Sequence, residues 1–316
     1  MTKKILAIAG ATGAQGGGLA RAILADPTSA FTVRALTRDV NAPNARALAA
    51  LGAEVVAADL HDRASLDRAF AGAYGAYCVT FFWNHFSPEK EMAEARNMAL
   101  AAKAAGLDHV VWSTLDDTRT LVPLSDDRMP TLMGSYKVPH FDAKGESNQF
   151  FLDAGVPTTF MLTSFYWDNF VHFGSGPARN ADGQLLLTMP MGSSRLGGIA
   201  AEDIGACARG VFTQRERFVG KTIGVVSEFL SGVEMAAGLA EALGEPVSYQ
   251  AVPPAAFRAF GFPGAEDLGN MFQVYTEFEA HFRTTRDPVL SRELNPGLLS
   301  YHAWLAKYAA RIPNIR

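Results

Sequence analysis

Three glycines near the N-terminus have the spacing of a turn that binds the pyrophosphate of a dinucleotide. Gly10, Gly13 and Gly16 follow the apolar run Lys4–Ala9, and the helical pattern Ala14–Ala25 begins among them. The first glycine permits a tight turn, the second lets a pyrophosphate approach the backbone, and the third lets helix and strand pack closely. The helix N-terminus adds unpaired N–H groups and a positive dipole end. The pattern predicts phosphate binding; a glycine-rich turn without a ligand is the alternative.

The residues after the next predicted strand bear on which dinucleotide fits. Arg38 and Asp39 follow the strand Phe31–Thr37, where an NAD-binding unit usually places an acidic residue for the ribose 2′-hydroxyl. Arg38 offers a permanently charged donor for a 2′-phosphate and could stack on the adenine, and Thr37 could add a hydroxyl. We therefore predict NADP(H) in preference to NAD(H). A solvated Arg38 with Asp39 on the ribose is the alternative.

Two further strand ends could contact the same dinucleotide. Asp59 and Leu60 follow the third predicted strand and could meet the adenine edge, although Asp59 could equally cap its loop. Thr80, Phe81 and Phe82 follow the fourth strand and supply apolar and aromatic surface near the middle of the cofactor. Packing in the core would explain the aromatic residues equally well.

Three residues could carry the chemistry of a reduction. Ser113 lies at the end of the predicted strand His109–Thr114, and His140 and Lys144 open the helix that follows. Because they stand four residues apart, His140 and Lys144 share one helix face. Lys144 could bond the nicotinamide ribose, while the His140 imidazole or the Ser113 hydroxyl could deliver a proton to a reduced carbonyl. A purely structural histidine is the alternative for His140.

Strands and helices alternate along the first half of the chain. The predicted strands are Lys4–Ala9, Phe31–Thr37, Ala53–Ala58, Tyr74–Thr80, His109–Thr114 and Thr158–Thr163. The predicted helices between them are Ala14–Ala25, Ala42–Leu51, Ala64–Gly72, Glu89–Ala105 and His140–Ala154. This alternation predicts an α/β fold, a Rossmann-type doubly wound parallel sheet covered on both faces.

The alternation becomes irregular after about Leu162. The turn residues of hairpins fill Arg179–Gly198, and helices are predicted over Gly232–Leu243, Glu266–Phe282 and Leu298–Ala310. We therefore predict an NAD(P)-binding domain over residues 1–163, completed by parts of 195–228. Residues 164–316 are predicted to form a smaller mixed α/β lobe that contacts a substrate or a partner.

Composition narrows the classes of function. The chain has 316 residues, 48% of them hydrophobic, and a net charge of −4 without an extended basic field, so we expect no direct nucleic-acid binding. Its two cysteines, Cys78 and Cys207, predict buried thiols in a reducing compartment, and we predict no metal site. The uncharged stretch Ala69–Pro88 contains glycine, asparagine and histidine, which favours a buried strand and loop over a membrane span. We predict a cytoplasmic protein.

Seven short blocks spread over nearly the whole chain occur together in one known family. They are GATGAQGG at Gly10–Gly17, TRD at Thr37–Asp39, GAEVV at Gly52–Val56, HFDAKGE at His140–Glu146, GVP at Gly155–Pro157, FYWDN at Phe165–Asn169 and GFPGAEDLGNMF at Gly261–Phe272. With these blocks the sequence resembles the atypical short-chain dehydrogenase/reductases of the NmrA-like family, and in particular its HSCARG-like branch.

The resemblance implies a Rossmann-type domain with a smaller α/β lobe that binds NADP(H) or NAD(H). By position, the phosphate loop would comprise Gly10, Ala11, Thr12, Gly13, Ala14 and Gln15, with Arg38 on the 2′-phosphate and Lys144 beside the nicotinamide ribose. The segment lining the nicotinamide end would comprise Tyr166, Trp167, Asp168 and Asn169.

Three departures from the family pattern matter for function. His140 stands where the tyrosine of a short-chain Tyr-x-x-x-Lys pattern is expected, so the usual proton donor of ketone reduction is missing. Ala93 occupies the position of a second lysine, which lowers the expected cofactor affinity. Thr80, Phe81 and Phe82 replace a more polar segment, which favours an apolar site.

Two functions are therefore predicted as alternatives. The first, slightly favoured, is an NAD(P)H-dependent reductase of a small apolar, aromatic or quinone-like substrate, because a quinone needs no strong general acid. The second is a non-enzymatic redox sensor that responds to NADP(H) and acts through a protein partner, as the resemblance to HSCARG-like proteins implies. The sequence leaves a homodimer open.

Overall fold

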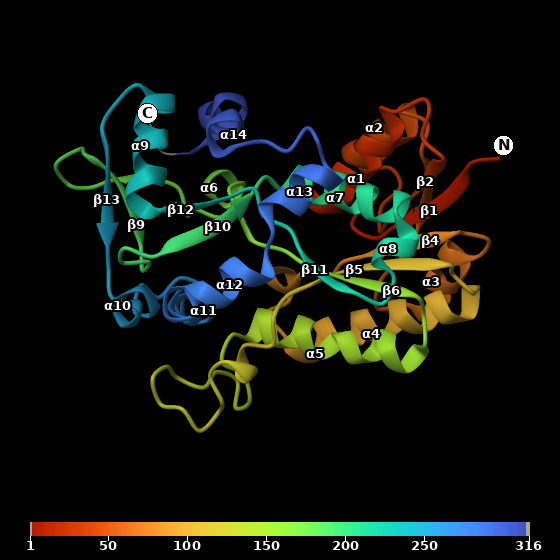
Figure 1. Cartoon of the computed structure of the whole chain (residues 1–316), viewed down its shortest axis with the longest axis horizontal. Coiled ribbons are helices and arrows are strands. Elements are labelled where there is room, and N and C mark those ends of the chain that lie inside the picture. Colours follow the sequence, from red (N-terminus) through yellow and green to blue (C-terminus); the bar gives the residue numbers. More distant parts are fainter. Residues whose placement is uncertain (1, 314–316) are drawn as a thin grey trace.

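The computed structural model describes residues 2–313, and a seven-stranded parallel sheet lies at its centre (Figure 1). Its strands are β1 (Lys4–Ile8), β2 (Phe31–Thr37), β3 (Glu54–Ala57), β4 (Gly75–Cys78), β5 (His109–Thr114), β6 (Thr158–Leu162) and β11 (Thr222–Gly224). They are arranged in the order β11-β6-β5-β4-β1-β2-β3, with every neighbouring pair parallel. The chain order reverses between β1 and β4, the place where such sheets bind ligands at the carboxyl ends of their strands. The predicted doubly wound sheet is confirmed.

Helices cover both faces of this sheet. One face is covered by α1 (Ala14–Leu24), α2 (Pro43–Ala50), α7 (Ala201–Thr213) and α8 (Arg215–Phe218), and the other by α3 (Arg63–Phe70), α4 (Pro88–Ala105) and α5 (Pro139–Ala154). α1 and α7 cross at very short range because each has a glycine at the crossing. A Cβ atom on Gly18 would lie 2.3 Å from the carbonyl oxygen of Glu202, and one on Gly205 would lie 2.1 Å from the amide nitrogen of Leu19.

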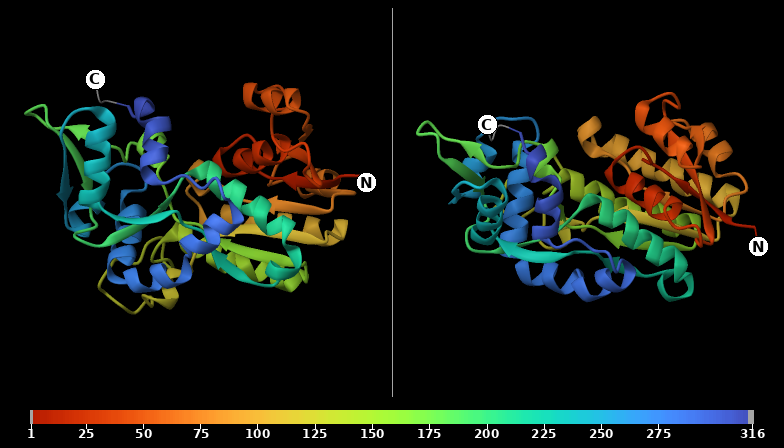
Figure 2. Two further views of the ribbon diagram at one scale, coloured as in Figure 1. Left: turned by 45° about the horizontal axis from the view of Figure 1, so that its top comes forward. Right: turned by 90° about the horizontal axis from the view of Figure 1, so that it is seen from above.

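A smaller lobe of mixed structure is built from the C-terminal part of the chain (Figure 2). One three-stranded sheet contains β7 (Phe165–Tyr166), β10 (Arg195–Ile199) and β12 (Glu228–Ser231), and the other contains β8 (Ala178–Arg179), β9 (Leu185–Met189) and β13 (Val247–Ala251). The helices are α6 (Asn169–His172), α9 (Gly232–Leu243), α10 (Pro254–Arg258), α11 (Ala265–Glu277), α12 (Glu279–Thr285), α13 (Pro288–Leu294) and α14 (Tyr301–Tyr308). A separate apolar core rich in aromatic and methionine side chains holds this lobe together.

The chain leaves the first sheet after β6 and returns to it later. β6 ends at Leu162, β7 begins at Phe165 in another sheet, and α7 and β11 then bring residues 201–224 back to the first sheet and its helices. The boundary at residue 163, with a contribution from 195–228, stays a prediction. The helix expected over Glu266–Phe282 is in fact two helices, because Phe278 leaves the helical conformation between α11 and α12.

The two cysteines and the uncharged stretch Ala69–Pro88 lie within the described residues. Cys78 and Cys207 are free and buried, and burial raises the pKa of both thiols. None of the helices within residues 2–313 has the length and hydrophobicity to span a membrane. The stretch Ala69–Pro88 contains β4 and the short 3-10 helix η1 (Phe82–Asn84), as a buried strand followed by a loop.

Candidate active site

The glycine turn between β1 and α1 has the conformation that phosphate binding requires. Gly10 has a positive φ of 62°, and its carbonyl oxygen accepts a hydrogen bond from the Gly13 N–H at 2.9 Å. A Cβ atom on Gly16 would lie 2.5 Å from the same carbonyl oxygen, so only glycine fits there. Gly13 is the N-cap of α1 and offers no side chain to its first N–H groups. These groups therefore face the turn as ready donors to an anion.

Arg38 and Asp39 follow β2 beside this turn, and only the Asp39 side chain has a hydrogen-bond partner in the protein. Asp39 Oδ1 accepts a hydrogen bond from the Asn41 N–H at 2.8 Å, and Thr37 Oγ1 bonds the Asp39 backbone, so both residues shape the loop. Arg38 is exposed and forms no hydrogen bond or ion pair with the rest of residues 2–313. The guanidinium is therefore the available group for a 2′-phosphate, while Asp39 already serves the loop.

Asp59, predicted as a contact to the adenine, caps its own loop. Its Oδ1 accepts from the His61 N–H at 2.9 Å, and Ser65 Oγ bonds both the N–H and the carbonyl oxygen of Asp59. Asn97 Nδ2 on α4 donates to the Leu60 carbonyl oxygen at 2.9 Å. The loop after β3 is thus held rigidly, and a contact from Asp59 or Leu60 to a cofactor stays a prediction.

Gln15, in the first turn of α1, joins strands of both lobes. Its Oε1 accepts hydrogen bonds from the Tyr77 hydroxyl and, at 2.8 Å, from Ser113 Oγ. Its Nε2 donates to the hydroxyl of Tyr166 on β7, and burial raises the pKa of Tyr166 to about 12. The Ser113 hydroxyl is therefore already committed to Gln15, and its proposed part in proton delivery stays a prediction.

Lys144, on α5, lies in a ring of acceptors at the end of β4. Its Nζ forms an ion pair with Glu91 Oε1 at 2.6 Å, and it donates hydrogen bonds to Thr80 Oγ1 at 2.5 Å and to the Thr80 carbonyl oxygen at 3.2 Å. The Thr80 hydroxyl in turn donates to Glu91 Oε1 at 2.5 Å. The ammonium group thus contacts three oxygen atoms of the protein, and a ribose hydroxyl would compete with these contacts.

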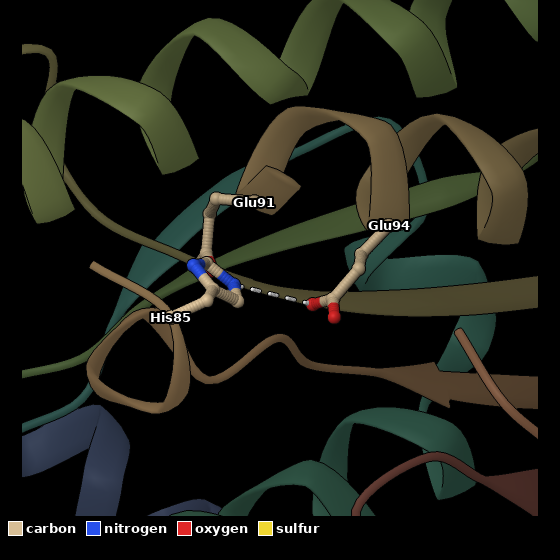
Figure 3. A group of neighbouring side chains, drawn as sticks. All are labelled: His85, Glu91 and Glu94. Atoms are coloured by element: carbon tan, nitrogen blue, oxygen red, sulfur yellow. Dashed lines mark ion pairs between the residues drawn. The ribbon is translucent and has the colours of Figure 1, made fainter. Parts of the chain in front are cut away.

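His85 and Glu94 lie close to Glu91 (Figure 3), and His61 lies beside Glu94. His85 Nε2 lies 3.4 Å from Glu91 Oε2 and 3.9 Å from Glu94 Oε2, and Glu94 Oε1 is 3.0 Å from Nε2 of the half-exposed His61. Glu91 is completely buried; burial opposes its charge, but Lys144, His85 and Thr80 outweigh it and lower its pKa to about 2. Burial and the neighbouring Glu91 raise the pKa of Glu94 to about 7.

The donor atoms of His85, Glu91 and Glu94 lie within 4.8 Å of one another, a spacing that a metal ion could bridge. The imidazole argues against this. His85 Nδ1 accepts a hydrogen bond from the Ser87 N–H at 3.1 Å, so the ring proton belongs on Nε2, the nitrogen that faces the two glutamates. A metal-binding histidine instead donates from its second nitrogen and presents a lone pair to the ion. We interpret the three residues as a charge cluster that supports Lys144.

His140 lies one turn before Lys144 and is held from the second lobe. Its Nδ1 bonds Asp267 Oδ1 on α11 at 2.6 Å, and its backbone N–H donates to Asp267 Oδ2 at 3.1 Å. The ring lies 4.7 Å, centroid to centroid, from Trp83 and from Phe141. No residue within 2–313 bonds Nε2, so the nitrogen opposite Asp267 is available for proton transfer.

α11 also holds the long loop that precedes His140. Asn270 Nδ2 donates to the Lys137 carbonyl oxygen at 2.6 Å and to that of Pro130 at 2.9 Å. Asp142 on α5 holds the same loop from the other side of the contact. Its carboxylate accepts hydrogen bonds from the backbone N–H groups of Thr118 and Lys137, both at 2.8 Å. The position of His140 therefore depends on contacts between the two lobes.

The aromatic residues predicted near the cofactor divide into two groups. Trp167 is 1% exposed and packs against Tyr301 and Trp304, so it belongs to the core of the second lobe. Phe82 is also buried, whereas Phe81 is 53% exposed and its ring centroid lies 6.4 Å from that of the exposed Phe173.

The polar residues of the same segment have local roles. Asp168 Oδ2 accepts from the Ala201 N–H at 2.8 Å and so stabilises the start of α7. Asn169 is half-buried at the start of α6, and its contact with a cofactor stays a prediction, as do those of Ala11, Thr12 and Ala14.

Known proteins resemble this chain in sequence and in fold. A sequence model of the NmrA-like family matches residues 1–301. The chain belongs to the NmrA-like family. The match runs through both lobes, and the finer assignment to an HSCARG-like branch stays a prediction.

Relatives and solved structures resemble this NmrA-like chain over nearly its full length. FrzB of Cladobotryum sp, an NmrA-like family domain-containing oxidoreductase, is 29% identical over an alignment of 289 positions that covers 85% of this chain and 82% of FrzB. The negative transcriptional regulator NmrA in complex with NADP has a TM-score of 0.78 at 23% identity, over 98% of this chain and 96% of its own. Citrobacter sp. triphenylmethane reductase complexed with NADP(H) has a TM-score of 0.76 at 22% identity, over 96% of this chain and 99% of its own. These structures share the fold.

Sequence reasoning missed two residues of this NmrA-like site, Glu91 and Asp267. Glu91 resembles an ordinary acidic residue in the first turn of a helix, and nothing local reveals that it is buried against Lys144. Asp267 lies within GFPGAEDLGNMF, the most distinctive block of the C-terminal part, which could have drawn attention to it. Its partner His140 is 127 residues away in the chain.

Proposed function

We propose that this protein binds NADP(H) and reduces a small apolar, aromatic or quinone-like substrate. The backbone N–H groups at the start of α1 would bind the pyrophosphate, and Arg38 the 2′-phosphate. Solved structures of the same fold are complexes with NADP, with NADP(H) or with NAD, which supports a nicotinamide dinucleotide as the cofactor. An Asp39 already occupied by its loop supports NADP(H) over NAD(H).

The observation that carries the proposal of catalysis is the Asp267–His140 pair. An imidazole whose Nδ1–H is held by a buried carboxylate has a fixed orientation, with Nε2 directed away from the carboxylate, as proton transfer from Nε2 requires. Lys144 stands on the same face of α5 and could hold the nicotinamide ribose by exchanging its longest contact, the 3.2 Å bond to the Thr80 carbonyl oxygen. When bound, NADPH supplies the hydride. His140 Nε2 then gives its proton to the acceptor oxygen, which completes a two-electron reduction.

The substrate class is inferred from the exposed aromatic pair. Phe81 follows β4 and Phe173 ends α6, so each lobe contributes one ring, and both are more than half exposed. Exposed aromatic rings that lie side by side often mark a binding surface for an apolar partner. A planar apolar acceptor could lie against them beside the end of β4.

Turnover of NADPH tests this proposal. The purified protein is given NADPH and saturating concentrations of quinones and aromatic carbonyl compounds, and loss of NADPH is followed. We expect turnover with at least one quinone and a strong decrease in His140→Asn. The matched control is His302→Asn, since His302 is an exposed histidine of the second lobe. Tight NADPH binding without any turnover across the panel would contradict the enzymatic part.

A redox sensor is the second candidate, and the contacts of α11 are the observation that favours it. The same helix bonds His140 and the long loop before it, so a change at the nicotinamide end could alter the second lobe and a protein partner bound there. NADP⁺ and NADPH should then give different patterns of limited proteolysis or different oligomeric states. Identical patterns with both forms would contradict sensing.

A further inference from the structure

Lys144 and Glu91 form a charge pair that is complete without a ligand. The Lys144 side chain is nearly buried, and its ammonium group forms an ion pair with Glu91 Oε1 and hydrogen bonds to the hydroxyl and carbonyl oxygens of Thr80. Glu91 is completely buried, and one of its oxygens receives both Lys144 and the Thr80 hydroxyl. The pair therefore adds no net charge to the end of β4, although it contains a lysine.

The second carboxylate oxygen of Glu91, Oε2, faces His85 instead of Lys144. Glu91 Oε2 is buried and has no hydrogen-bond partner among residues 2–313, and the same is true of His85 Nε2 at 3.4 Å. Glu91 Oε2 faces His85 Nε2 without the geometry of a hydrogen bond, so the close contacts of the carboxylate to Lys144 and Thr80 are made through Oε1. Glutamine would keep the shape and an oxygen for Thr80, would remove the negative charge beside Lys144, and would place an NH₂ group toward one of the two sides.

We propose that Glu91 is a positioning residue that cancels the charge of Lys144, so that the site binds NADP⁺ and NADPH with similar affinity. This inference rests on the proposed binding of NADP(H) with its nicotinamide end near Lys144. An oxidised nicotinamide ring carries a positive charge and a reduced ring carries none. An uncompensated lysine beside the ring would therefore favour NADPH over NADP⁺, and the carboxylate of Glu91 removes this preference.

The affinity ratio of the two redox forms tests the proposal. Dissociation constants for NADP⁺ and NADPH are measured by calorimetric titration of wild type, Glu91→Gln and Lys144→Met. In Glu91→Gln we expect the ratio of the NADP⁺ constant to the NADPH constant to rise about tenfold, the order of effect of one partly screened unit charge. In Lys144→Met the ratio should fall, because Glu91 is left unpaired. The double variant should return close to the wild-type ratio.

Controls separate charge from structure. Glu89→Gln removes an exposed carboxylate from the first turn of the same helix and should leave the ratio unchanged. Glu91→Asp restores the charge and should recover most of the wild-type ratio. Equal weakening of both redox forms in Glu91→Gln would reduce Glu91 to a structural residue and overturn the inference. If Glu91→Gln does not fold, an unchanged ratio in Lys144→Met overturns it. Wild type that binds neither form contradicts the proposed function instead.

Discussion

The two ends of the candidate site are built in opposite ways. At the phosphate end, one turn of backbone between β1 and α1 supplies the N–H groups, and Arg38 beside it is exposed and has no side-chain partner within residues 2–313. At the hydride end, four charged or titratable side chains meet in two pairs, Lys144 with Glu91 and His140 with Asp267. They come from α4, α5 and α11, and all are buried or nearly so.

Because of this difference, substitutions at the phosphate end should change cofactor affinity, whereas substitutions at the hydride end should also change the stability of the fold. At the phosphate end, charge is left open for a ligand, so a substitution of Arg38 should change affinity and little else. At the hydride end, each charge is compensated inside the protein, so removal of one partner leaves the other buried and unpaired. Such a loss is costly even without a ligand. Substitutions at the two ends should therefore give different combinations of effects.

The largest effect is expected from Asp267→Asn, which breaks a pair at the hydride end. Asparagine can still accept from the His140 backbone N–H, but its amide NH₂ would then face Nδ1 and could no longer accept the Nδ1 hydrogen that orients the ring. We expect kcat of the reductase to fall about 300-fold with little change in KM for NADPH, by analogy with acid–base pairs of this kind. Steady-state kinetics of wild type and variant with NADPH and a quinone measures this.

The control for this prediction is Glu266→Gln, an exposed carboxylate next to Asp267 on α11. It should keep the kinetic constants of wild type. If Asp267→Asn behaved like this control, Asp267 would have no part in proton transfer, and the two ends of the site would differ less than their geometry indicates.

Glu94→Gln sharpens the comparison through the pH dependence of stability. Burial and Glu91 raise the pKa of Glu94 from 4.5 to about 7, against the opposing charges of His85 and Lys144, with His61 and Asp59 also facing it. The folded protein thus keeps a proton that the unfolded chain loses. Stability should fall as the pH rises from 4.5 to 7 and stay level above that. This contribution amounts to about 3 kcal/mol and should be missing in Glu94→Gln.

Urea unfolding at both ends of this interval measures the contribution of Glu94. Wild type and Glu94→Gln should have nearly the same free energy of unfolding near pH 4.5, and the variant should be the more stable one near pH 8. A constant difference between them at every pH would show that Glu94 does not titrate in this interval.

Arg38→Ala tests the phosphate end, with a smaller expected effect. Loss of a guanidinium from a 2′-phosphate should weaken NADPH binding about 20-fold, with NADH binding and the free energy of unfolding unchanged. Arg68→Ala is a matched control, because Arg68 is an exposed arginine of α3. If Arg38→Ala weakened NADPH and NADH equally, the preference for the phosphorylated cofactor would have another origin.

The same contrast explains what sequence reasoning could predict. The phosphate turn was accessible because all its requirements lie between Gly10 and Gly16, and the strand and helix around it have clear periodicity. Lys144 and His140 were found as residue types on one helix face. Their partners Glu91 and Asp267 were not found, because the contacts of these residues exist only once α4 and α11 pack against α5. Trp167 shows the converse: its aromatic segment suggested a cofactor contact, and burial against Trp304 gives it a place in the core.

The smallest effect is expected from Phe81→Ala, in the exposed pair of rings that we propose as the substrate surface. Phe81 is exposed and its ring contacts only Phe173 among the aromatic rings of residues 2–313, so its removal should leave stability and NADPH binding unchanged. We expect KM for an apolar quinone to rise about fourfold, the value of one partly buried ring on a ligand. Phe260→Ala removes an equally exposed ring of the second lobe and should change nothing. An unchanged KM in Phe81→Ala would move the substrate away from this pair of rings, whereas a changed NADPH affinity would assign Phe81 to the cofactor, as its place after β4 first indicated.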